Sequence, residues 1–383
     1  MSWPMVKLST VCTLINGRAY AKDELLSEGK YEVLRVGNFF SNRDWYYSDL
    51  ELPEDKYCDH GDLLYAWSAS FGPRIWGGKK VIYHYHIWKI VIDEGVVDKK
   101  YLFYALQNDV ESIKREQGTG STMIHVTKSA MEDRLIPLPP LPEQKRIAAI
   151  LVKADAIRRK RQQAIQLADD FLRAVFLDMF GDPVTNPKGW KVVELSTLVD
   201  PDDKLNYGVV QPGDDEEDGV PLVRSGDLSD VTPNVNQLRR VSASIDSKHR
   251  KSKLKGNEIL IACVGTIGRV GWVSDAMIGW NIARAVTRIP IREGVNREYV
   301  YRYLQNPVVQ GYFVRETRAV AQPTLNVGLI AKTPVALPPH DLQIAFLERY
   351  RTIQAYKERL LVALGAQDEL AGCLSQRAFA GQL

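Results

Sequence analysis

The stretch "IPLPPLPEQKRIAAIL" at Ile136–Leu151 places four prolines within six residues directly before a strongly helix-forming segment, and "VALPPHDLQIAFL" at Val335–Leu347 repeats the pattern. Proline fixes φ, lacks a backbone N–H and is tolerated before or within the first turn of a helix. Each proline ladder therefore predicts a stiff exit from one domain into a long helix. "FGDPVTNPKGW" at Phe180–Trp190 then predicts the end of the first helix and the start of a second domain.

The two ladders belong to a longer internal repeat with an offset of 199 residues, because Leu138–Pro140 aligns with Leu337–Pro339. Further matches occur in the same order in both halves of the chain, and collinear matches of this kind indicate a duplication. They pair "EGVVDKKYLFYALQND" (Glu94–Asp109) with "EGVNREYVYRYLQNP" (Glu293–Pro307), "GDLLYAWSASFG" (Gly61–Gly72) with "GNEILIACVGTIG" (Gly256–Gly268), "YEVLRVGNF" (Tyr31–Phe39) with "VPLVRSGDL" (Val220–Leu228), and "KLST" (Lys7–Thr10) with "ELST" (Glu194–Thr197).

Each copy begins with short β-type runs and turns rich in Gly, Asn, Asp and Pro, which predict a strand-dominated α+β domain. The part after each ladder predicts a helix of about 38 residues, or about 55 Å at 1.5 Å per residue. Such a helix is longer than a small domain is wide, which favours two long helices packed together over an amphipathic helix lying on its own domain. We expect the polar positions Arg161, Arg349 and Gln367 to fix the register of the pair. The stripes in 3,4 spacing are Ile147, Ile150, Ala154, Ile157, Arg161, Ala164, Ala168, Phe171 and Val175, and Phe346, Arg349, Ile353, Tyr356, Leu360, Ala363, Gln367, Leu370 and Leu374.

Composition sets only broad limits on function. The 383 residues carry a net charge of +3, which is too small to indicate nucleic-acid binding by itself. No apolar run reaches the length of a membrane span, and the N-terminal residues do not resemble a signal peptide. The cysteines Cys12, Cys58, Cys263 and Cys373 form no CxxC pair, which predicts reduced thiols, a cytoplasmic location and no structural zinc.

Motifs for catalysis are missing. The sequence contains neither a GxxxxGK[ST] phosphate loop nor the DPPY or NPPY tetrapeptide of adenine methyltransferases. "PEDK" (Pro53–Lys56) and "PDDK" (Pro201–Lys204) lack the separated carboxylates of a nuclease metal site. His84 and His86 could hold a metal, but without a third ligand they are better interpreted as surface histidines. We therefore predict no catalytic residues and no metal site.

Basic, glycine-containing loops at corresponding places of both copies favour DNA binding over an ordinary solvated surface. "SFGPRIWGGKK" (Ser70–Lys80) and "SKHRKSKLKG" (Ser247–Gly256) are the main clusters, and "GTIGRVG" (Gly265–Gly271) predicts a tight, exposed turn. Arg35 and Arg224 recur in both copies, which favours a structural role. The candidate DNA-contacting residues are Arg43, Ser70, Arg74, Lys79, Lys80, Gly118, Thr119, Ser121 and Thr122 in the first copy, and Lys248, Arg250, Lys251, Thr266, Arg269, Gln322 and Thr324 in the second. Thr266 and Thr324 could instead stabilise turns.

The combination resembles the specificity subunit of type I restriction–modification systems. The resemblance covers essentially the whole chain, and the second ladder departs from the first, with His340-Asp341-Leu342 where the first has Leu141-Pro142-Glu143. The segments that carry the resemblance are "PLPPLPEQKRIAAIL" (Pro137–Leu151), "LPPHDLQIAFL" (Leu337–Leu347), the helix ends "FLDMFGD" and "QRAFAGQL", "NPKGWKVVELSTL" (Asn186–Leu198), "RVGNF", "RSGDL", "GTIGR" and "AQPTLN" (Ala321–Asn326).

The resemblance implies an α+β chain with two tandem strand-rich target-recognition domains (1–140 and 186–339), separated by two long antiparallel coiled-coil helices (141–185 and 340–383), with an internal pseudo-two-fold repeat. It implies a non-catalytic subunit in which each recognition domain reads half of a split, asymmetric double-stranded DNA target. Two modification subunits that use S-adenosylmethionine to methylate adenine N6 would dock on the helices, and restriction subunits that use ATP and Mg would join them. The exposed helix residues expected to dock partners, or otherwise only to cap and solvate the helices, are Glu143, Gln144, Arg146, Lys153 and Gln343.

Two readers on one face of a duplex should sit about 34–36 Å apart, so the helix length would set the spacer between the half-sites. Two alternatives remain at this point. One is a stand-alone DNA-binding protein without a methyltransferase partner, and the other is an enzyme with an unrecognised catalytic motif. The half-site sequences themselves cannot be read from the chain, because loops of this kind follow no residue-to-base code.

Overall fold

The computed structural model describes residues 3–41, 43–68, 70–117, 125–317 and 324–383. The chain divides into two compact units: unit 1 comprises residues 1–164 and 360–383, and unit 2 comprises residues 165–359. Each unit contains one strand-rich globule and one part of each long helix. In the described part of the chain, no helix combines the length and the apolar character that a membrane span requires.

Unit 1 contains a four-stranded sheet in the order β2-β9-β6-β7, a second in the order β4-β3-β8-β5, and the antiparallel pair β1-β10. Only β3 and β8 pair in parallel among these described strands. The strands are β1 (Met5–Lys7), β2 (Cys12–Asn16), β3 (Tyr31–Leu34), β4 (Tyr46–Ser48), β5 (Tyr57–Cys58), β6 (Leu63–Ala66), β7 (Gly72–Ile75), β8 (Val81–Tyr83), β9 (Ile87–Ile92) and β10 (Leu135–Pro137). The helices that begin in this unit are α1 (Val36–Phe40), α2 (Lys99–Gln117), α3 (Lys128–Glu132) and α4 (Leu141–Phe180).

Unit 2 repeats this scheme. Its sheets have the orders β12-β18-β15-β16, β14-β13-β17 and β11-β19, and β13 pairs with β17 in parallel, as β3 does with β8. The strands are β11 (Lys191–Glu194), β12 (Asn206–Tyr207), β13 (Val220–Val223), β14 (Arg240–Val241), β15 (Glu258–Ala262), β16 (Val270–Trp272), β17 (Asn281–Ile282), β18 (Val286–Pro290) and β19 (Pro334–Leu337). The helices are α5 (Ala243–Lys248), α6 (Arg297–Gln305), α7 (Pro307–Thr317), α8 (Val327–Ala331) and α9 (His340–Phe379). The predicted α+β class and internal repeat are confirmed.

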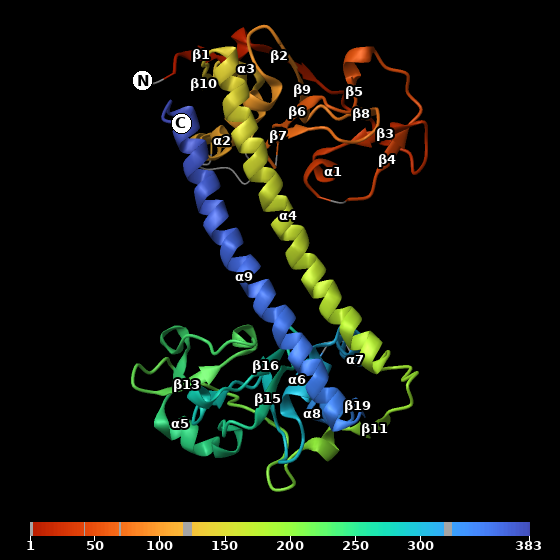
Figure 1. Cartoon of the computed structure of the whole chain (residues 1–383), viewed down its shortest axis with the longest axis vertical. Coiled ribbons are helices and arrows are strands. Elements are labelled where there is room, and N and C mark those ends of the chain that lie inside the picture. Colours follow the sequence, from red (N-terminus) through yellow and green to blue (C-terminus); the bar gives the residue numbers. More distant parts are fainter. Residues whose placement is uncertain (1–2, 42, 69, 118–124, 318–323) are drawn as a thin grey trace. The chain divides into compact units, whose positions relative to one another are not determined.

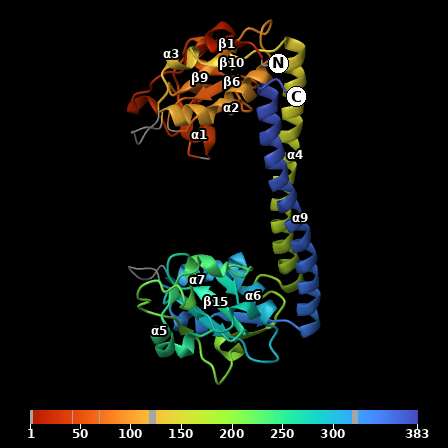
Figure 2. The same ribbon diagram turned by 90° about the vertical axis from the view of Figure 1, so that its left-hand side faces the viewer.

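The helices α4 and α9 are each 40 residues long and start 199 residues apart. In unit 1, the first half of α4 lies beside the last half of α9 (Figures 1 and 2), and Arg158 forms an ion pair with Asp368. In unit 2, the last half of α4 lies beside the first half of α9, and the rings of Phe176 and Phe346 are 5.6 Å apart. Residues early in one helix meet residues late in the other within each unit, so the predicted antiparallel pairing is confirmed.

Two of the three polar positions in the apolar stripes join the helices in unit 1. Gln367 Nε2 donates to the backbone oxygen of Ala154 at 2.9 Å, and Arg161 donates to the backbone oxygen of Ala363. Arg349, in unit 2, is exposed. Gln367 and Arg161 therefore each bond to the backbone of the facing helix, and the expectation that they fix the register stays a prediction.

The helix ends complete the core of each globule. In unit 1, Ile147 of α4 and Ala378 of α9 are buried in the cluster that contains Trp88 and Leu102. In unit 2, Phe346 is buried together with Tyr299 and Phe313. Each globule thus depends on both helices for part of its apolar burial.

Candidate nucleic-acid interface

Three segments of unit 1 that are distant in sequence meet beside the turn at residues 84–86, between β8 and β9. The backbone N–H of Trp67, which follows β6, donates to the oxygen of His86 at 3.1 Å. The N–H of Val126 donates to the oxygen of Trp67 at 3.4 Å, and His125 forms a β-bridge with Ser68. These segments (67–68, 84–86 and 125–126) form what we call the loop junction of unit 1.

Unit 2 contains the same junction. The N–H of Cys263, after β15, donates to the oxygen of Ala285 at 2.8 Å, and the N–H of Leu325 donates to the oxygen of Cys263 at 3.0 Å. The loop junction of unit 2 therefore consists of Cys263, the turn 283–285 and Leu325. Its donors and acceptors match those of unit 1 one by one, so the duplication extends to individual backbone hydrogen bonds.

Several predicted DNA-contacting residues lie at these junctions. Ser70 and Thr324 are exposed close to junction segments in the chain, and Thr266 and Arg269 lie on the exposed loop after β15. Thr266 Oγ1 donates to the backbone oxygen of Ser225 at 3.4 Å and so joins the loop after β15 to the turn after β13. Arg269 reaches the backbone oxygen of the neighbouring Gly226 at 3.4 Å. The predicted residues that fall outside the described residues are Gly118, Thr119, Ser121, Thr122 and Gln322.

The recurring arginines occupy equivalent positions beside the junctions. The N–H of Arg35 donates to Asn38 Oδ1 at 3.4 Å, and the N–H of Arg224 donates to Asp227 Oδ2 at 2.9 Å. Both bonds close the start of a helical turn, and the Arg224 side chain also pairs with Asp227 at 3.1 Å. The shared bond comes from the backbone, whereas the side chains differ, because the Arg35 guanidinium lies over the ring of Tyr46 at 4.9 Å, so a structural role for the two arginines stays a prediction.

A polar recess of about 530 Å³ opens in unit 1 next to the turn at 84–86. Burial, with the neighbouring charges of His86 and Arg35, lowers the pKa of His84 to about 4. Burial, followed by the charges of His125 and Arg35, also lowers the pKa of His86. Both imidazoles are therefore neutral at pH 7 and can each donate and accept one hydrogen bond. The recess is lined by Arg35, Val36, Gly37, Asn38, Arg43, Asp44, Tyr46, His84 and His86.

Arg43, a predicted DNA contact, is exposed at this recess, and the half-buried His84 and His86 are accessible from the surface through it. No cluster of three His, Cys, Asp or Glu side chains is arranged to hold a metal ion within the part of the chain that the structure describes.

Two other predicted cations of the first copy, Lys79 and Lys80, lie away from the turn. Lys79 and Lys80 precede β8, whereas His84 follows it, so they occupy the opposite end of that strand. Lys79 pairs with Glu32 at 2.9 Å and Lys80 with Glu54 at 2.7 Å. Arg74 on β7 covers the ring of Phe39 at 5.5 Å. Sequence proximity grouped these residues, but the fold separates Lys79 and Lys80 from the loop junction.

In unit 2, the basic segment with Lys248, Arg250 and Lys251 is exposed, and a buried arginine hydrogen-bonds its backbone. Arg288 is 0% exposed and donates to the backbone oxygen of Lys251 at 2.8 Å. Its guanidinium also pairs with Asp203 and with Glu258, the latter at 2.7 Å. This network orders the backbone of the basic segment and leaves its side chains free to meet phosphates.

The expectation that the docking residues are exposed is wrong for two of them. Gln144 is 1% exposed: its amide donates to the oxygens of Pro139 and Val96 at 2.8 and 3.0 Å, and its oxygen accepts from the N–H of Asp98. Gln343 is 8% exposed and donates to the oxygen of Pro338 at 2.9 Å. Both satisfy carbonyls of the proline ladders, which pattern analysis could not reveal.

The remaining docking candidates lie on α4. Arg146 and Lys153 are exposed, and Glu143 is half-buried and pairs with Arg146 at 2.7 Å.

The two duplicated α+β globules, each with the same loop junction, both match one class of DNA specificity domain. Residues 2–167 and 187–358 match the family model described as the type I restriction modification DNA specificity domain. The chain belongs to this family and is a type I specificity subunit with two copies of the domain.

Similar proteins extend over almost the whole chain. The specificity subunit of type I restriction enzyme EcoBI from Escherichia coli is 29% identical, covering 100% of this chain and 86% of that protein. The MjaVIII specificity subunit from Methanocaldococcus jannaschii is 24% identical, covering 92% of this chain and 86% of that protein. The crystal structure of a type I S subunit from M. genitalium has the same fold, with a TM-score of 0.59 at 15% identity, covering 99% and 96% of the two chains. A structure from a study of complex assembly in a type I R-M system gives a TM-score of 0.61 at 18% identity. The match covers 100% of this chain and 98% of that chain.

Sequence reasoning missed the turn at the centre of each junction. The repeat aligns "KVIYHYHIWKI" (Lys80–Ile90) with "GWNIARAVTRI" (Gly279–Ile289) at the same offset of 199. The side chains in the middle of this stretch are chemically different in the two copies. Sequence similarity between the copies therefore does not single out this segment. The parallel strand pairs on both sides, β3 with β8 and β13 with β17, reveal the equivalence.

Proposed function

We propose that this chain is the non-catalytic subunit that reads a split, asymmetric DNA target, with one half-site assigned to each unit. The observation that carries the proposal is the duplicated loop junction, which has one backbone scheme but different side chains in the two units. Two readers of equal shape and unequal chemistry suit two different sequences at the ends of one site. Exposed cations around the junctions, including Arg43 and Arg269, suit the phosphate backbone on either side.

We also propose that two modification subunits bind to α4 and α9. These helices expose large apolar side chains in both units, such as Val362, Phe171 and Leu370. Apolar residues that gather on an exposed helix surface mark an interaction site rather than an ordinary solvated face. The modification subunits would bind S-adenosylmethionine, and restriction subunits using ATP and Mg would join them. No residue of this chain is assigned a part in those reactions.

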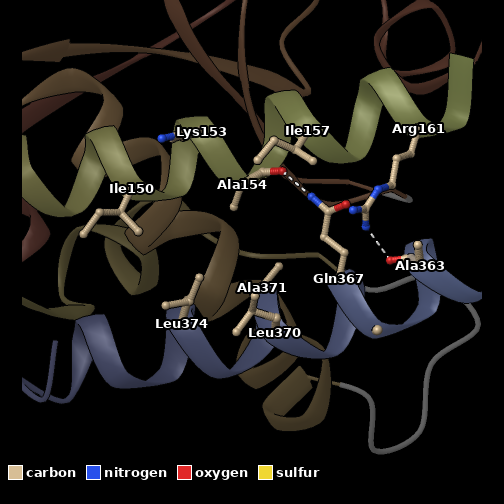
Figure 3. Close-up of a pocket in the computed structure, with 11 residues that line it drawn as sticks. Ile150, Lys153, Ala154, Ile157, Arg161, Ala363, Gln367, Leu370, Ala371 and Leu374 are labelled. Carbon is tan, nitrogen blue, oxygen red and sulfur yellow. Dashed lines mark hydrogen bonds between the residues drawn. The ribbon is translucent and has the colours of Figure 1, made fainter. Parts of the chain in front are cut away.

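A groove between α4 and α9 in unit 1 supports this placement (Figure 3). It has a volume of about 510 Å³, and its walls are mainly apolar, with Ile150 and Ile157 from α4 facing Leu370 and Leu374 from α9. Gln367 crosses the groove to the backbone of Ala154. A helix of a modification subunit with an apolar face is the proposed occupant.

A map of N6-methyladenine in cells that contain the cognate modification subunit, with and without this chain, tests the proposal. We expect a split motif that is methylated only when the chain is present. Methylation independent of the chain, or none, would contradict the proposal. Sequence-specific binding by the isolated chain without any dependent methylation would favour a stand-alone DNA-binding protein. Methylation or cleavage by the purified chain alone would instead identify an enzyme.

A further inference from the structure

The central turn of each loop junction has the same backbone in both units. The N–H of His84 donates to the oxygen of Leu34, and the N–H of Ala283 donates to that of Val223, both at 2.9 Å. The turns then close with the N–H groups of Ile87 and Val286, which donate to the oxygens of His84 and Ala283, again both at 2.9 Å. The scaffold is therefore common to both units.

The side chains on this common turn are entirely different. Unit 1 presents His84-Tyr85-His86, and unit 2 presents Ala283-Arg284-Ala285. The turn accepts either tripeptide, so the backbone conformation does not require any of these side chains. Positions that the fold does require behave in the opposite way, as at Tyr101 and Tyr299, where the same side chain donates its hydroxyl to an equivalent backbone oxygen.

We propose, as an extension of the function proposed above, that residues 84–86 and 283–285 are specificity-determining elements that contact the base edges of the half-site read by their own unit. The tip of each turn carries the main contact. Tyr85 is 37% exposed, and Arg284 is exposed at the equivalent position. Both tips therefore point side chains of different chemistry away from a common scaffold.

Arg284 is available for bidentate recognition. Within the described residues it has no ion-pair partner and its side chain makes no hydrogen bond, whereas Arg224 and Arg288 are both paired. A free guanidinium presents parallel N–H donors that match the O6 and N7 acceptors of guanine in the major groove. We therefore assign a G·C pair in the half-site of unit 2 to Arg284.

The turn of unit 1 is braced by aromatic rings. The ring centroid of Tyr85 lies 4.6 Å from that of His84 and 3.9 Å from that of His86, and Trp67 Nε1 donates to the backbone oxygen of Tyr85 at 2.8 Å. The two imidazoles also line the recess that contains Arg35 and Arg43. A fixed array of this kind presents several donors and acceptors with little loss of side-chain entropy on binding. The chemistry it offers differs from that of a single guanidinium, so the two half-sites should differ.

A reciprocal exchange of the two turns tests the inference in the assembled methyltransferase. The first variant carries His84→Ala, Tyr85→Arg and His86→Ala, and the second carries Ala283→His, Arg284→Tyr and Ala285→His. Each is expressed with the modification subunit, and N6-methyladenine is mapped across the genome. We expect the first variant to change one half-site and the second to change only the other. Lys191→Ala, an exposed cation on β11 away from the junction, is the matched control and should leave both half-sites unchanged.

The single substitutions Arg284→Ala and Arg284→Lys give a second measurement that does not depend on the exchanged turns folding. Because Arg284 is exposed, both variants should unfold at the wild-type temperature. Arg284→Ala should lower discrimination at one G·C position by roughly 5- to 150-fold, and Arg284→Lys should restore it only in part. Wild-type discrimination in the Arg284 variants, or active exchange variants with both half-sites unchanged, would overturn the inference and leave the proposed function intact. If the wild-type chain directs no methylation, the proposed function fails and this inference fails with it.

Discussion

Replacing Gln144 by alanine should destabilise unit 1 far more than the equivalent change, Gln343→Ala, destabilises unit 2. Gln144 makes three hydrogen bonds to backbone groups, whereas Gln343 makes one within the described structure. A buried hydrogen bond contributes about 1 kcal/mol to stability, and each orphaned partner adds a desolvation cost. We therefore expect losses of about 3 kcal/mol for Gln144→Ala and about 1 kcal/mol for Gln343→Ala. The lost side-chain volume is the same in both variants and cancels in the comparison.

Amide hydrogen exchange, resolved by peptide, is the appropriate assay, because a chain with two units does not unfold in a single two-state transition. Peptides from the first turns of α2, which follow Asp98, should exchange about 100-fold faster in Gln144→Ala, since 1.4 kcal/mol corresponds to a factor of ten. Peptides of α6 should change only about fivefold in Gln343→Ala. Unchanged protection of α2, together with weaker binding of the modification subunit, would refute the structural role and identify Gln144 as a docking residue.

Four further predictions concern other parts of the chain. Gln367→Leu should change the stability of unit 1 by less than about 1 kcal/mol in a denaturant titration, because losing the bond from Nε2 to Ala154 offsets removal of the buried Oε1, which has no partner among the described residues. Arg288→Met should cost about 3–5 kcal/mol in unit 2 by leaving Glu258 buried and unpaired, and a smaller loss would show that water solvates the carboxylate. The folded-state pKa of His84 is lowered from 6.5 to about 4, so its contribution to stability is complete above pH 6.5 and is lost as the pH falls towards 4. The full shift corresponds to about 3 kcal/mol and the partly exposed ring to about half of that, and His84→Ala should flatten the profile of unit 1 between these pH values. Deletion of one heptad from α4 should change the spacer between methylated half-sites or abolish assembly, and an unchanged spacer would exclude the idea that the helices measure it.

The sequence predicted the architecture because the features that determine it are local or repeated. Proline ladders act on the residues beside them, and the stripes of α4 and α9 follow the period of a single helix. Burial that depends on tertiary hydrogen bonds could not be predicted in this way. Gln144 has the polarity of a surface residue, and only the fold brings the oxygens of Val96 and Pro139 to it. The partners of Arg288 likewise lie 30 and 85 residues away in the chain.

The candidate interface was only partly predictable for a related reason. Charge and glycine content singled out Lys79, Lys80 and the loop around Thr266, but composition does not specify which end of a strand a loop will occupy. The fold places Lys79 and Lys80 at the opposite end of β8 from the junction, paired with carboxylates. It places the turn at 84–86, which carries no strong charge signal, at the centre of the junction.

Duplication within one chain separates the residues that maintain the fold from those free to vary on it. Tyr101 and Tyr299 illustrate the first kind, because each donates its hydroxyl, at 2.7 and 2.8 Å, to a backbone oxygen of the strand that precedes the long helix, and each lies at the start of an equivalent helix. The central turns illustrate the second kind, since their backbone bonds recur and their side chains do not. A protein that reads two different sequences with one duplicated scaffold needs both kinds of position. The strict repetition of the hydrogen bonds around the turns is therefore what allows their side chains to differ without loss of the fold.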